Sequence, residues 1–320
     1  MKIVILGYTG LIGNNILKDL FKKTSYDLIC VGRNIKNKPH ISSRVKYFKW
    51  DFTTFKKSNL SFLKRTNIII NCVGKTNSNK ENLENINVIF VKKLLKHINI
   101  CQFKLRLIHL SSIAVYGGAR SYVGQKKFIT ENSTVKVNDS YSKSKLLGDL
   151  LIKDIIKKNS NKNFSYTILR ISNVIGGKEK TNLYKFVMFS LKFGFWIKSS
   201  NDIMFNFVNV KDVTQAVILT LSKLKVSKNK TYIVSDDCKQ YKLYKIYQNL
   251  YKKKIKKIHV PISFIKFLIY FIPLPKKFFN LLLIISSHVS YNNKKIKKEL
   301  NFNPRFSILK KIKYPNEKKI

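Results

Sequence analysis

Short apolar runs of strand length alternate with stretches of helical apolar spacing through the first half of the chain. The strand-like runs are Lys2–Leu6, Leu28–Val31, Val45–Trp50, Ile68–Cys72, Leu105–Leu110 and Tyr166–Ile171. Helical spacing is found in Leu11–Phe21, Asn85–Ile98 and Tyr141–Ile156. Because strands that alternate with helices form parallel sheets with a helix layer on each face, the pattern predicts an α/β fold with a doubly wound parallel sheet.

The alternation becomes irregular beyond Asn173. Ordered elements are still indicated there by Phe205–Val210, Val213–Leu221, Thr231–Ser235 and Tyr241–Leu250. We therefore expect a first domain over residues 1–172 and a smaller lobe over residues 173–320. Elements within residues 205–235 are expected to return to the first domain.

Two strongly apolar segments, Phe264–Ile272 and Phe278–Ile285, are separated by prolines and lysines. Neither reaches the length of roughly 18–20 residues that a membrane-spanning helix needs. Two interpretations remain. The segments form short core helices of the smaller lobe, or they form an interfacial hairpin whose flanking lysines meet anionic lipid headgroups.

The formal net charge of the chain is +47 at pH 7, and lysine supplies almost all of it. Arginine, whose guanidinium fork suits nucleic-acid recognition, is scarce, and the lysines are spread along the whole chain. We expect no specific nucleic-acid partner and at most weak membrane contact. The four cysteines (Cys30, Cys72, Cys101 and Cys238) lie too far apart for a metal site. No secretion signal is recognised, and a cytoplasmic protein without a metal is expected.

A glycine-rich turn, Gly7-Tyr-Thr-Gly10-Leu-Ile-Gly13, joins the first predicted strand to the first predicted helix. In such a turn one glycine permits the tight bend, the second lets the backbone approach a pyrophosphate, and the third lets helix and strand pack closely. The helix N-terminus then offers N–H groups to the phosphates. The context predicts a Rossmann dinucleotide site, with these contact residues: Gly7, Thr9, Gly10, Leu11, Ile12 and Gly13.

The end of the second strand distinguishes NAD from NADP. An acidic residue there would bind the ribose hydroxyl of NAD, but the chain has Gly32-Arg33-Asn34. Arg33 can pair with the 2′-phosphate of NADP, or it can only stack on the adenine or face water. We expect NADP, with NAD as the alternative. Further cofactor contacts are expected at the ends of the third and fourth strands, from Asp51, Phe52, Val73 and Gly74.

A catalytic set is indicated by Tyr141-Ser-Lys-Ser-Lys145, which places a tyrosine and a lysine on one helix face. From there Lys145 can lower the pKa of Tyr141 and reach the nicotinamide ribose. Ser112 lies about thirty residues earlier, at the end of a predicted strand, in Ser111-Ser112-Ile-Ala-Val-Tyr116-Gly117. The three elements predict an oxidoreductase that moves a hydride.

With these motifs the chain resembles the NAD-dependent epimerase/dehydratase family of the extended short-chain dehydrogenase/reductase superfamily. The resemblance covers nearly the whole chain. Further matching segments are Leu169–Gly176, Phe207–Val213, Tyr232–Ser235 and Lys294–Phe306. It implies that Tyr141 is the acid/base, Lys145 its partner and cofactor contact, and Ser112 the donor to the substrate oxygen. Asn173 would bind the phosphate side of the substrate, which in the family is mostly a sugar nucleotide.

Three departures from the family pattern bear on the reaction. The acidic pair that sugar 4,6-dehydratases carry after the serine is replaced by Ile113 and Ala114, which cannot transfer protons, so dehydration is not expected. The arginine that often grips the pyrophosphate is replaced by Phe205 and Asn206. No arginine lies between Arg170 and Arg305, so bidentate phosphate binding near the C-terminal stretch is absent.

Two reactions on a sugar nucleotide therefore stay open, 4-epimerisation and reduction of a 4-keto-sugar. A lipid-linked sugar at a membrane surface is an alternative substrate. A regulatory protein that binds NADP without catalysis is an alternative class, although such a protein has no need of Ser112, Tyr141 and Lys145. The resemblance also allows a homodimer.

Overall fold

The structure is a computed structural model that describes residues 1–35, 42–53, 62–63, 65–76, 78–100, 104–158, 163–176, 190, 192–199, 203–252 and 256–306. Its centre is a seven-stranded sheet in the order β12-β7-β5-β4-β1-β2-β3, in which all neighbouring strands are parallel. The strands are β1 (Lys2–Leu6), β2 (Asp27–Gly32), β3 (Val45–Lys49), β4 (Ile68–Asn71), β5 (Leu105–Ser112), β7 (Phe164–Ile171) and β12 (Lys230–Val234).

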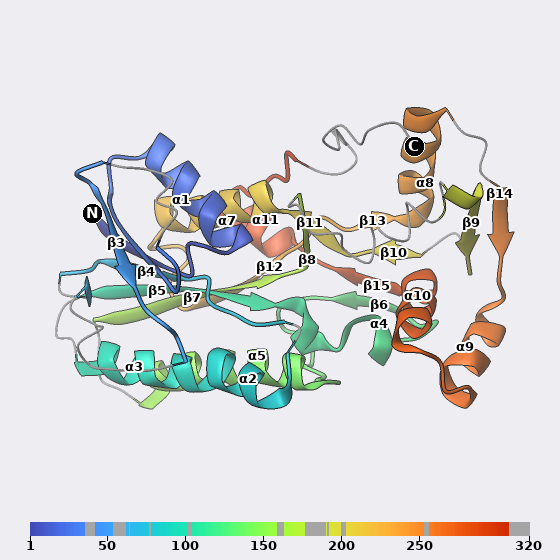
Figure 1. Ribbon diagram of the computed structural model, residues 1–320, viewed down its shortest axis with the longest axis horizontal. Coiled ribbons are helices and arrows are strands. Elements are labelled where there is room, and N and C mark those ends of the chain that lie inside the picture. Colours follow the sequence, from blue (N-terminus) through green and yellow to red (C-terminus); the bar gives the residue numbers. More distant parts are fainter. Residues whose placement is uncertain are drawn as a thin grey trace.

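Helices cover both faces of this sheet (Figure 1). One face carries α1 (Leu11–Lys23), α7 (Val210–Ser222) and α11 (Lys294–Leu300). The other carries α2 (Lys80–Glu84), the π-helix η2 (Asn85–Ile89), α3 (Phe90–Ile100) and α5 (Ser140–Lys158). A separate apolar cluster fills each interface between sheet and helices. The predicted doubly wound α/β fold is confirmed.

The central strands are apolar without alternation because both of their faces are covered. Every residue of β7 is buried, and so is every residue of β5 except its last, Ser112. The chain runs from β1 outwards to β2 and β3 and then returns to β4 on the other side of β1. In open parallel sheets, ligands bind at the carboxyl ends of the strands where the order reverses in this way. The loops after β1 and β4 meet at that point.

The remaining described strands form short two-stranded sheets that extend from the middle of the molecule towards one end (Figure 1). The pairs are β6 (Lys126–Ile129) with β15 (His288–Tyr291), β8 (Asn173–Ile175) with β11 (Phe207–Asn209), β9 (Phe195–Lys198) with β14 (Lys256–His259), and β10 (Met204–Phe205) with β13 (Cys238–Lys239). Helix α8 (Gln240–Tyr251) lies beside them. The boundary at residue 172 stays a prediction, although β12 does belong to the central sheet.

The two apolar segments near the end of the chain form α9 (Ile262–Phe271) and α10 (Lys276–Ser286). The interpretation as core helices holds for one side of α9, where Ile262, Ile265 and Ile269 pack into the core of the small lobe, although only Ile265 is fully buried. Helix α10 packs better, with Ile285 buried and Leu281, Leu282 and Ile284 against the core of the small lobe. Within the described residues, no helix is both long and apolar enough to span a bilayer.

Candidate functional site

The glycine turn between β1 and α1 needs its glycines for space. Gly7 has a positive φ of 79°, and a Cβ on Gly13 would lie 2.4 Å from the Gly7 carbonyl oxygen. The Gly10 N–H donates to that same oxygen at 3.1 Å, which closes the turn. Gly10 is the N-cap of α1 and brings no side chain to accept from the first turn of the helix. The arrangement of Gly7 to Gly13 suits a phosphate at a helix N-terminus.

Arg33 and Asp51 stand at the ends of β2 and β3, and both are exposed. Two hydrogen bonds from Thr53 and the charge of Arg33 lower the pKa of Asp51. The sequence did not indicate an acid near Arg33, whereas the structure brings one there from the next strand. The ring of Phe52 is buried against Trp50 and Phe90 at centroid distances of 5.4 and 5.1 Å. Phe52 can therefore face a cofactor only through its backbone.

The segment after β4 approaches the predicted catalytic lysine. The Asn71 side chain accepts from the Val73 N–H at 3.0 Å and lies 3.1 Å from the buried His109. A Cβ on Gly74 would lie 3.8 Å from the Lys145 ammonium nitrogen. The structure thus brings Gly74, from the predicted cofactor set, next to Lys145, from the predicted catalytic set.

Lys145 is buried at 4% exposure and donates to the carbonyl oxygen of Leu110 at 2.7 Å. Burial lowers the pKa of Lys145 to about 8, although the negative charge of Asp149 opposes this. Few lysines are buried so deeply without a carboxylate on the ammonium group itself. A buried amine with a lowered pKa is a common feature of functional sites.

Tyr141 lies against Ser112, as the sequence predicts for a catalytic pair. Burial raises the pKa of Tyr141, while a hydrogen bond with the Ser112 hydroxyl lowers it in part. The expectation that Lys145 lowers the pKa of Tyr141 stays a prediction. Its ammonium group is bonded to Leu110, and the further charges that act on Tyr141 are those of Asp139 and Asp149, which raise its pKa. Ser112 also caps the short 3-10 helix η3 (Ile113–Tyr116) by accepting from the Ala114 N–H.

Asn87 is a site residue that the sequence analysis missed. It is buried at 2% exposure on the π-helix η2. Its carboxamide accepts from the Lys75 N–H and donates to the Lys75 carbonyl, both at 3.1 Å, and donates to the Ser144 hydroxyl at 2.9 Å. Asn87 therefore ties the loop after Gly74 to the residue before Lys145. The sequence could have indicated Asn87, because it is a polar residue in the apolar stripe of that helix, between Leu83 and Phe90.

A buried ion pair next to the predicted catalytic residues was also missed. Arg170 bonds Asp149 at 3.0 Å, and both side chains are at most 3% exposed. The Arg170 guanidinium donates to the Tyr116 hydroxyl at 2.6 Å. Asp149 follows Lys145 by one helical turn, and its charge favours the protonated form of that lysine. The pair therefore anchors α5 to β7 and also acts on Lys145 electrostatically.

Asn173 lies apart from this cluster, on the short strand β8. It is exposed and donates to the Asn206 carbonyl at 2.8 Å. The Asn206 carboxamide in turn donates to Asp237 and to the Val289 carbonyl, each at 2.8 Å. Burial raises the pKa of Asp237 to about 7. Where the family pattern has a pyrophosphate-gripping arginine, this chain thus has an amide that is bonded to a carboxyl group.

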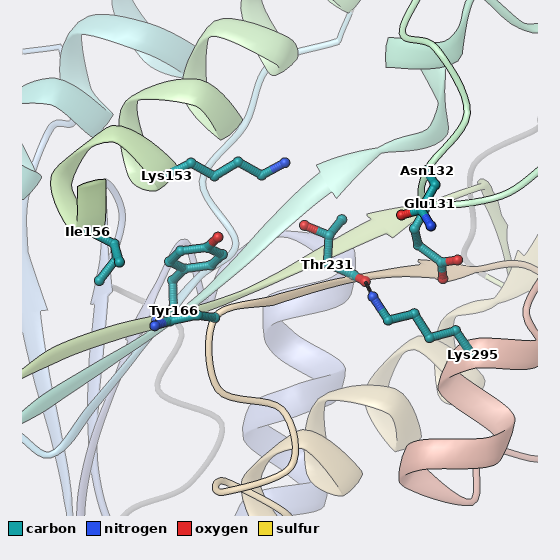
Figure 2. Close-up of a pocket in the computed structure, with 8 residues that line it drawn as sticks. Glu131, Asn132, Lys153, Ile156, Tyr166, Thr231 and Lys295 are labelled. Atoms are coloured by element: carbon teal, nitrogen blue, oxygen red, sulfur yellow. Dashed lines mark hydrogen bonds between the residues drawn. The ribbon is translucent and has the colours of Figure 1, made fainter. Parts of the chain in front are cut away.

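A separate cavity of about 390 Å³ lies along β12, an edge strand of the central sheet (Figure 2). Lys295 donates across it to the Thr231 carbonyl at 3.1 Å, and the Glu131 carboxylate accepts from the Ile233 N–H at 2.9 Å. None of the predicted site residues lines it. Glu131 instead covers part of an exposed strand edge, which protects the edge from pairing with another chain. Among the described residues, no cluster of histidine, cysteine and acidic side chains suits a metal ion.

The profile of the NAD dependent epimerase/dehydratase family matches residues 3–235 of the chain. None of the curated proteins matches it in sequence. Among solved structures, UDP-glucuronic acid 4-epimerase from Bacillus cereus in complex with NAD superposes with a TM-score of 0.70 at 17% identity, covering 96% of this chain and 93% of that one.

Two further solved structures have the same fold. MoeE5 in complex with UDP-glucuronic acid and NAD has a TM-score of 0.71 at 14% identity, with 97% and 96% of the two chains covered. dTDP-glucose 4,6-dehydratase from Bacillus anthracis in complex with NAD has a TM-score of 0.69 at 16% identity, with 97% and 93% covered. At such identities the likeness shows the fold of this chain and leaves its reaction to its own side chains.

Proposed function

The chain belongs to the NAD dependent epimerase/dehydratase family, and from this membership we propose that it is an NAD(P)-dependent enzyme acting on a sugar carbon of a sugar nucleotide. The observation that carries the proposal is the convergence of two predicted sets of residues. The buried Lys145 lies beside Gly74 of the cofactor set, and Tyr141 lies against Ser112 one helical turn away. Sugar nucleotides as substrates are supported by the UDP-glucuronic acid held by MoeE5.

A dinucleotide held by the turn from Gly7 to Gly13 and by Lys145 would supply the hydride chemistry. Tyr141 exchanges a proton with the sugar oxygen, and Ser112 holds that oxygen through a hydrogen bond. Lys145 holds the cofactor ribose and keeps a positive charge close to the reacting groups. Asn87 positions Lys145 through Ser144 and the loop at Lys75. Asn173 is proposed to contact the phosphate side of the substrate.

Reduction of a 4-keto-sugar is the first candidate reaction, and it needs Tyr141 to donate a proton to the carbonyl oxygen. Burial raises the pKa of Tyr141, so its hydroxyl is protonated at neutral pH, as that of an unperturbed tyrosine also is. Epimerisation uses the same residues in both directions and is the second candidate. Bound nucleotide separates them: NAD that stays with the purified protein supports an epimerase, whereas empty protein whose fluorescence changes with NADPH supports a reductase.

We propose further that this enzyme does not eliminate water. Ile113 is buried at 7% exposure, and the backbone N–H of Ala114 is bonded to Ser112. Neither side chain can transfer a proton, whereas elimination needs an acid and a base close to the reacting carbon. A 4,6-dehydratase has the same fold, so this part of the proposal rests on the two side chains alone.

Tyr141→Phe tests the proposed chemistry. We expect turnover to fall at least about 10²-fold while dinucleotide binding is retained, since a positioned acid/base contributes roughly that factor. Turnover is measured with UDP-glucuronic acid, UDP-glucose and their 4-keto forms, and binding by fluorescence titration. Tyr122→Phe is the matched control, because Tyr122 lies under the ammonium groups of Lys127 and Lys136 on another segment. Unchanged turnover in Tyr141→Phe would refute the assigned role.

The proposed preference for NADP depends on Arg33. This side chain is exposed at the end of β2, and a guanidinium fork suits the 2′-phosphate of NADP. The solved neighbours bind NAD, so the proposed preference rests on Arg33 of this chain alone. We expect Arg33→Asp to weaken NADPH binding at least about 10-fold and to improve NADH binding, since an acid accepts from ribose hydroxyls. Tighter binding of NAD than NADP by the unaltered protein would reverse the assignment.

A further inference from the structure

We propose that the outer face of the α9–α10 hairpin docks on the surface of a lipid bilayer that is rich in anionic headgroups. This outer face consists of six apolar side chains of α9, the turn and α10. Their exposed fractions are 52% for Phe264, 50% for Phe267, 66% for Tyr270, 76% for Phe271, 38% for Ile272 and 59% for Phe278. A concentration of exposed aromatic side chains of this kind marks an interaction site in soluble proteins.

Helix α9 has two apolar stripes, and the protein covers only one of them. Ile262, Ile265 and Ile269 pack into the core of the small lobe. Phe264, Phe267 and Phe271 follow a second stripe at helical spacing, and the rings of Phe267 and Phe271 stack at 5.6 Å. A helix that is apolar all round is expected to be buried in a core or in a membrane. In α9, the small lobe buries one of the two apolar stripes and leaves the other exposed.

The charge around the hairpin is complementary to anionic lipid. From Asp237 to Glu299 the sequence contains no other aspartate or glutamate, whereas it contains fifteen lysines. Lys252, Lys256, Lys257 and Lys266 are exposed. Lysines beside an apolar helix face bind anionic headgroups, while the aromatic rings enter the boundary between headgroups and acyl chains. This segment therefore combines both requirements for interfacial binding.

Other partners fit this surface less well. A second copy of the chain would bring one lysine-rich rim against another, and like charges at close range oppose such a contact. Nucleic acid would satisfy the lysines but would leave the aromatic side chains exposed. The described residues contain no helix that could cross a membrane, so the hairpin would lie in the interface. Aromatic side chains such as those of α9 favour this depth.

The hairpin is packed firmly on the segment that follows the catalytic serine. This segment includes η3, α4 (Gly118–Ser121) and the turn at Gly124. The Arg120 guanidinium lies 4.7 Å from the ring centre of Phe279 on α10. A Cβ on Gly124 would lie 2.7 Å from Ile262 of α9, and the Gly124 N–H donates to the Ser286 carbonyl at 3.4 Å. Docking of the hairpin would therefore orient the whole molecule on the bilayer.

Vesicle flotation tests the proposal without any enzyme assay. The full chain is mixed at near-physiological salt with vesicles of equal parts phosphatidylglycerol and phosphatidylethanolamine, or of phosphatidylcholine alone. We expect it to float with the anionic vesicles and much less with the neutral ones. The triple variant Phe264→Ser, Phe267→Ser, Phe271→Ser should bind the anionic vesicles at least about 100-fold more weakly, because three rings lose their apolar contact.

The matched control is Tyr241→Ser. Tyr241 is 40% exposed on α8, which lies at the opposite side of the lobe from α9 (Figure 1). The Tyr241→Ser variant should float like the unaltered protein. Circular dichroism and thermal unfolding of each variant confirm that the fold is retained, which we expect because all four side chains are exposed.

Three results would overturn the proposal. The unaltered protein would stay at the bottom of the gradient with both kinds of vesicle. The triple variant would float as well as the unaltered protein, which would assign any binding to lysines alone. Sedimentation velocity would show dimers of the unaltered protein that the triple variant cannot form, without vesicle binding, which would make the face a contact between two copies of the chain.

Discussion

Strand β7 and helix α9 are both composed mostly of apolar residues, yet they differ in how much of their surface is buried. All residues of β7 are buried, whereas Ile265 is the only buried residue of α9. The apolar sequence predicts in both cases that something covers the segment. In β7 the cover comes from helices of the same chain on both faces of the sheet, and in α9 half of it has to come from elsewhere. Apolar character thus predicts coverage without saying what provides it.

The polar groups of the two regions differ in the same way. In the sheet half, Asp149, Arg170 and Asn87 are almost completely buried and bonded to named partners. On the outer face of the hairpin the side chains are aromatic, and the nearby lysines are exposed. Substitutions should therefore change the free energy of unfolding strongly in the first region and weakly in the second.

The largest expected effect is that of Asp149→Ala. The substitution leaves the Arg170 guanidinium buried with only Tyr116 as a side-chain partner, and removal of one member of a buried ion pair costs about 3–5 kcal/mol. Asp19→Ala is the matched control, since Asp19 forms an exposed ion pair with Lys23 and should cost less than about 0.5 kcal/mol. Urea denaturation followed by circular dichroism measures both. If Asp149→Ala lowers the free energy of unfolding by less than about 1 kcal/mol, the expected difference between the two regions is wrong.

Lys145→Met is expected to stabilise the protein while it removes function. The buried ammonium group is costly at neutral pH, as its lowered pKa of about 8 shows, and its removal should add about 1–3 kcal/mol to the free energy of unfolding. Dinucleotide binding and turnover should both fall. Lys153→Met on the same helix is the control. A destabilised Lys145→Met protein would show that the lysine contributes to the fold.

The pH dependence of this effect follows from the direction of the shift. Below about pH 8, Lys145 is protonated in the folded and the unfolded chain, and the cost of burying its charge is present in full. Between pH 8 and the ordinary pKa of 10.5, the unfolded chain binds more protons, so the unaltered protein gains stability as the pH rises. The advantage of Lys145→Met should therefore shrink over that range. A constant difference from pH 7 to pH 10 would exclude the buried charge as its cause.

The smallest expected effect is that of Phe267→Ser on stability. Half of this side chain is already exposed, so the free energy of unfolding should change by no more than about 0.5 kcal/mol. Leu169→Ala on β7 is its buried counterpart and should cost about 2–5 kcal/mol, because it leaves a cavity in the core. Thermal and urea unfolding compare the two. A large loss in Phe267→Ser would mean that α9 supports the lobe through both of its stripes.

The sequence was sufficient for the fold wherever one local pattern defines an element. Each predicted strand of the sheet half is found, because runs such as Leu105–Leu110 are apolar on both faces and have the length of a strand. The turn from Gly7 to Gly13 could be predicted from the sequence because Gly7 and Gly13 each meet a local steric need. The helix that carries Tyr141 and Lys145 is found for the same reason, since its periodicity is local.

Features that depend on contacts between distant segments were not predictable in this way. The charge of Arg33 acts on Asp51 from the neighbouring strand, and no spacing in the sequence predicts that interaction. The bond from Lys145 to Leu110 depends on how α5 lies on β5. The exposure of Phe267 and Phe271 depends on which side of α9 the small lobe covers.

The π-helix η2 has a consequence for comparing this chain with its relatives. An α-helix advances about 100° per residue. Removal of one residue before Asn87 would therefore rotate α2 by about that angle relative to α3. The bulge therefore behaves as a one-residue insertion whose phase keeps Asn87 on Lys75 and Ser144. Alignments that place a gap between Asn79 and Phe90 would shift the wrong amide into the site, however well the flanking apolar residues match.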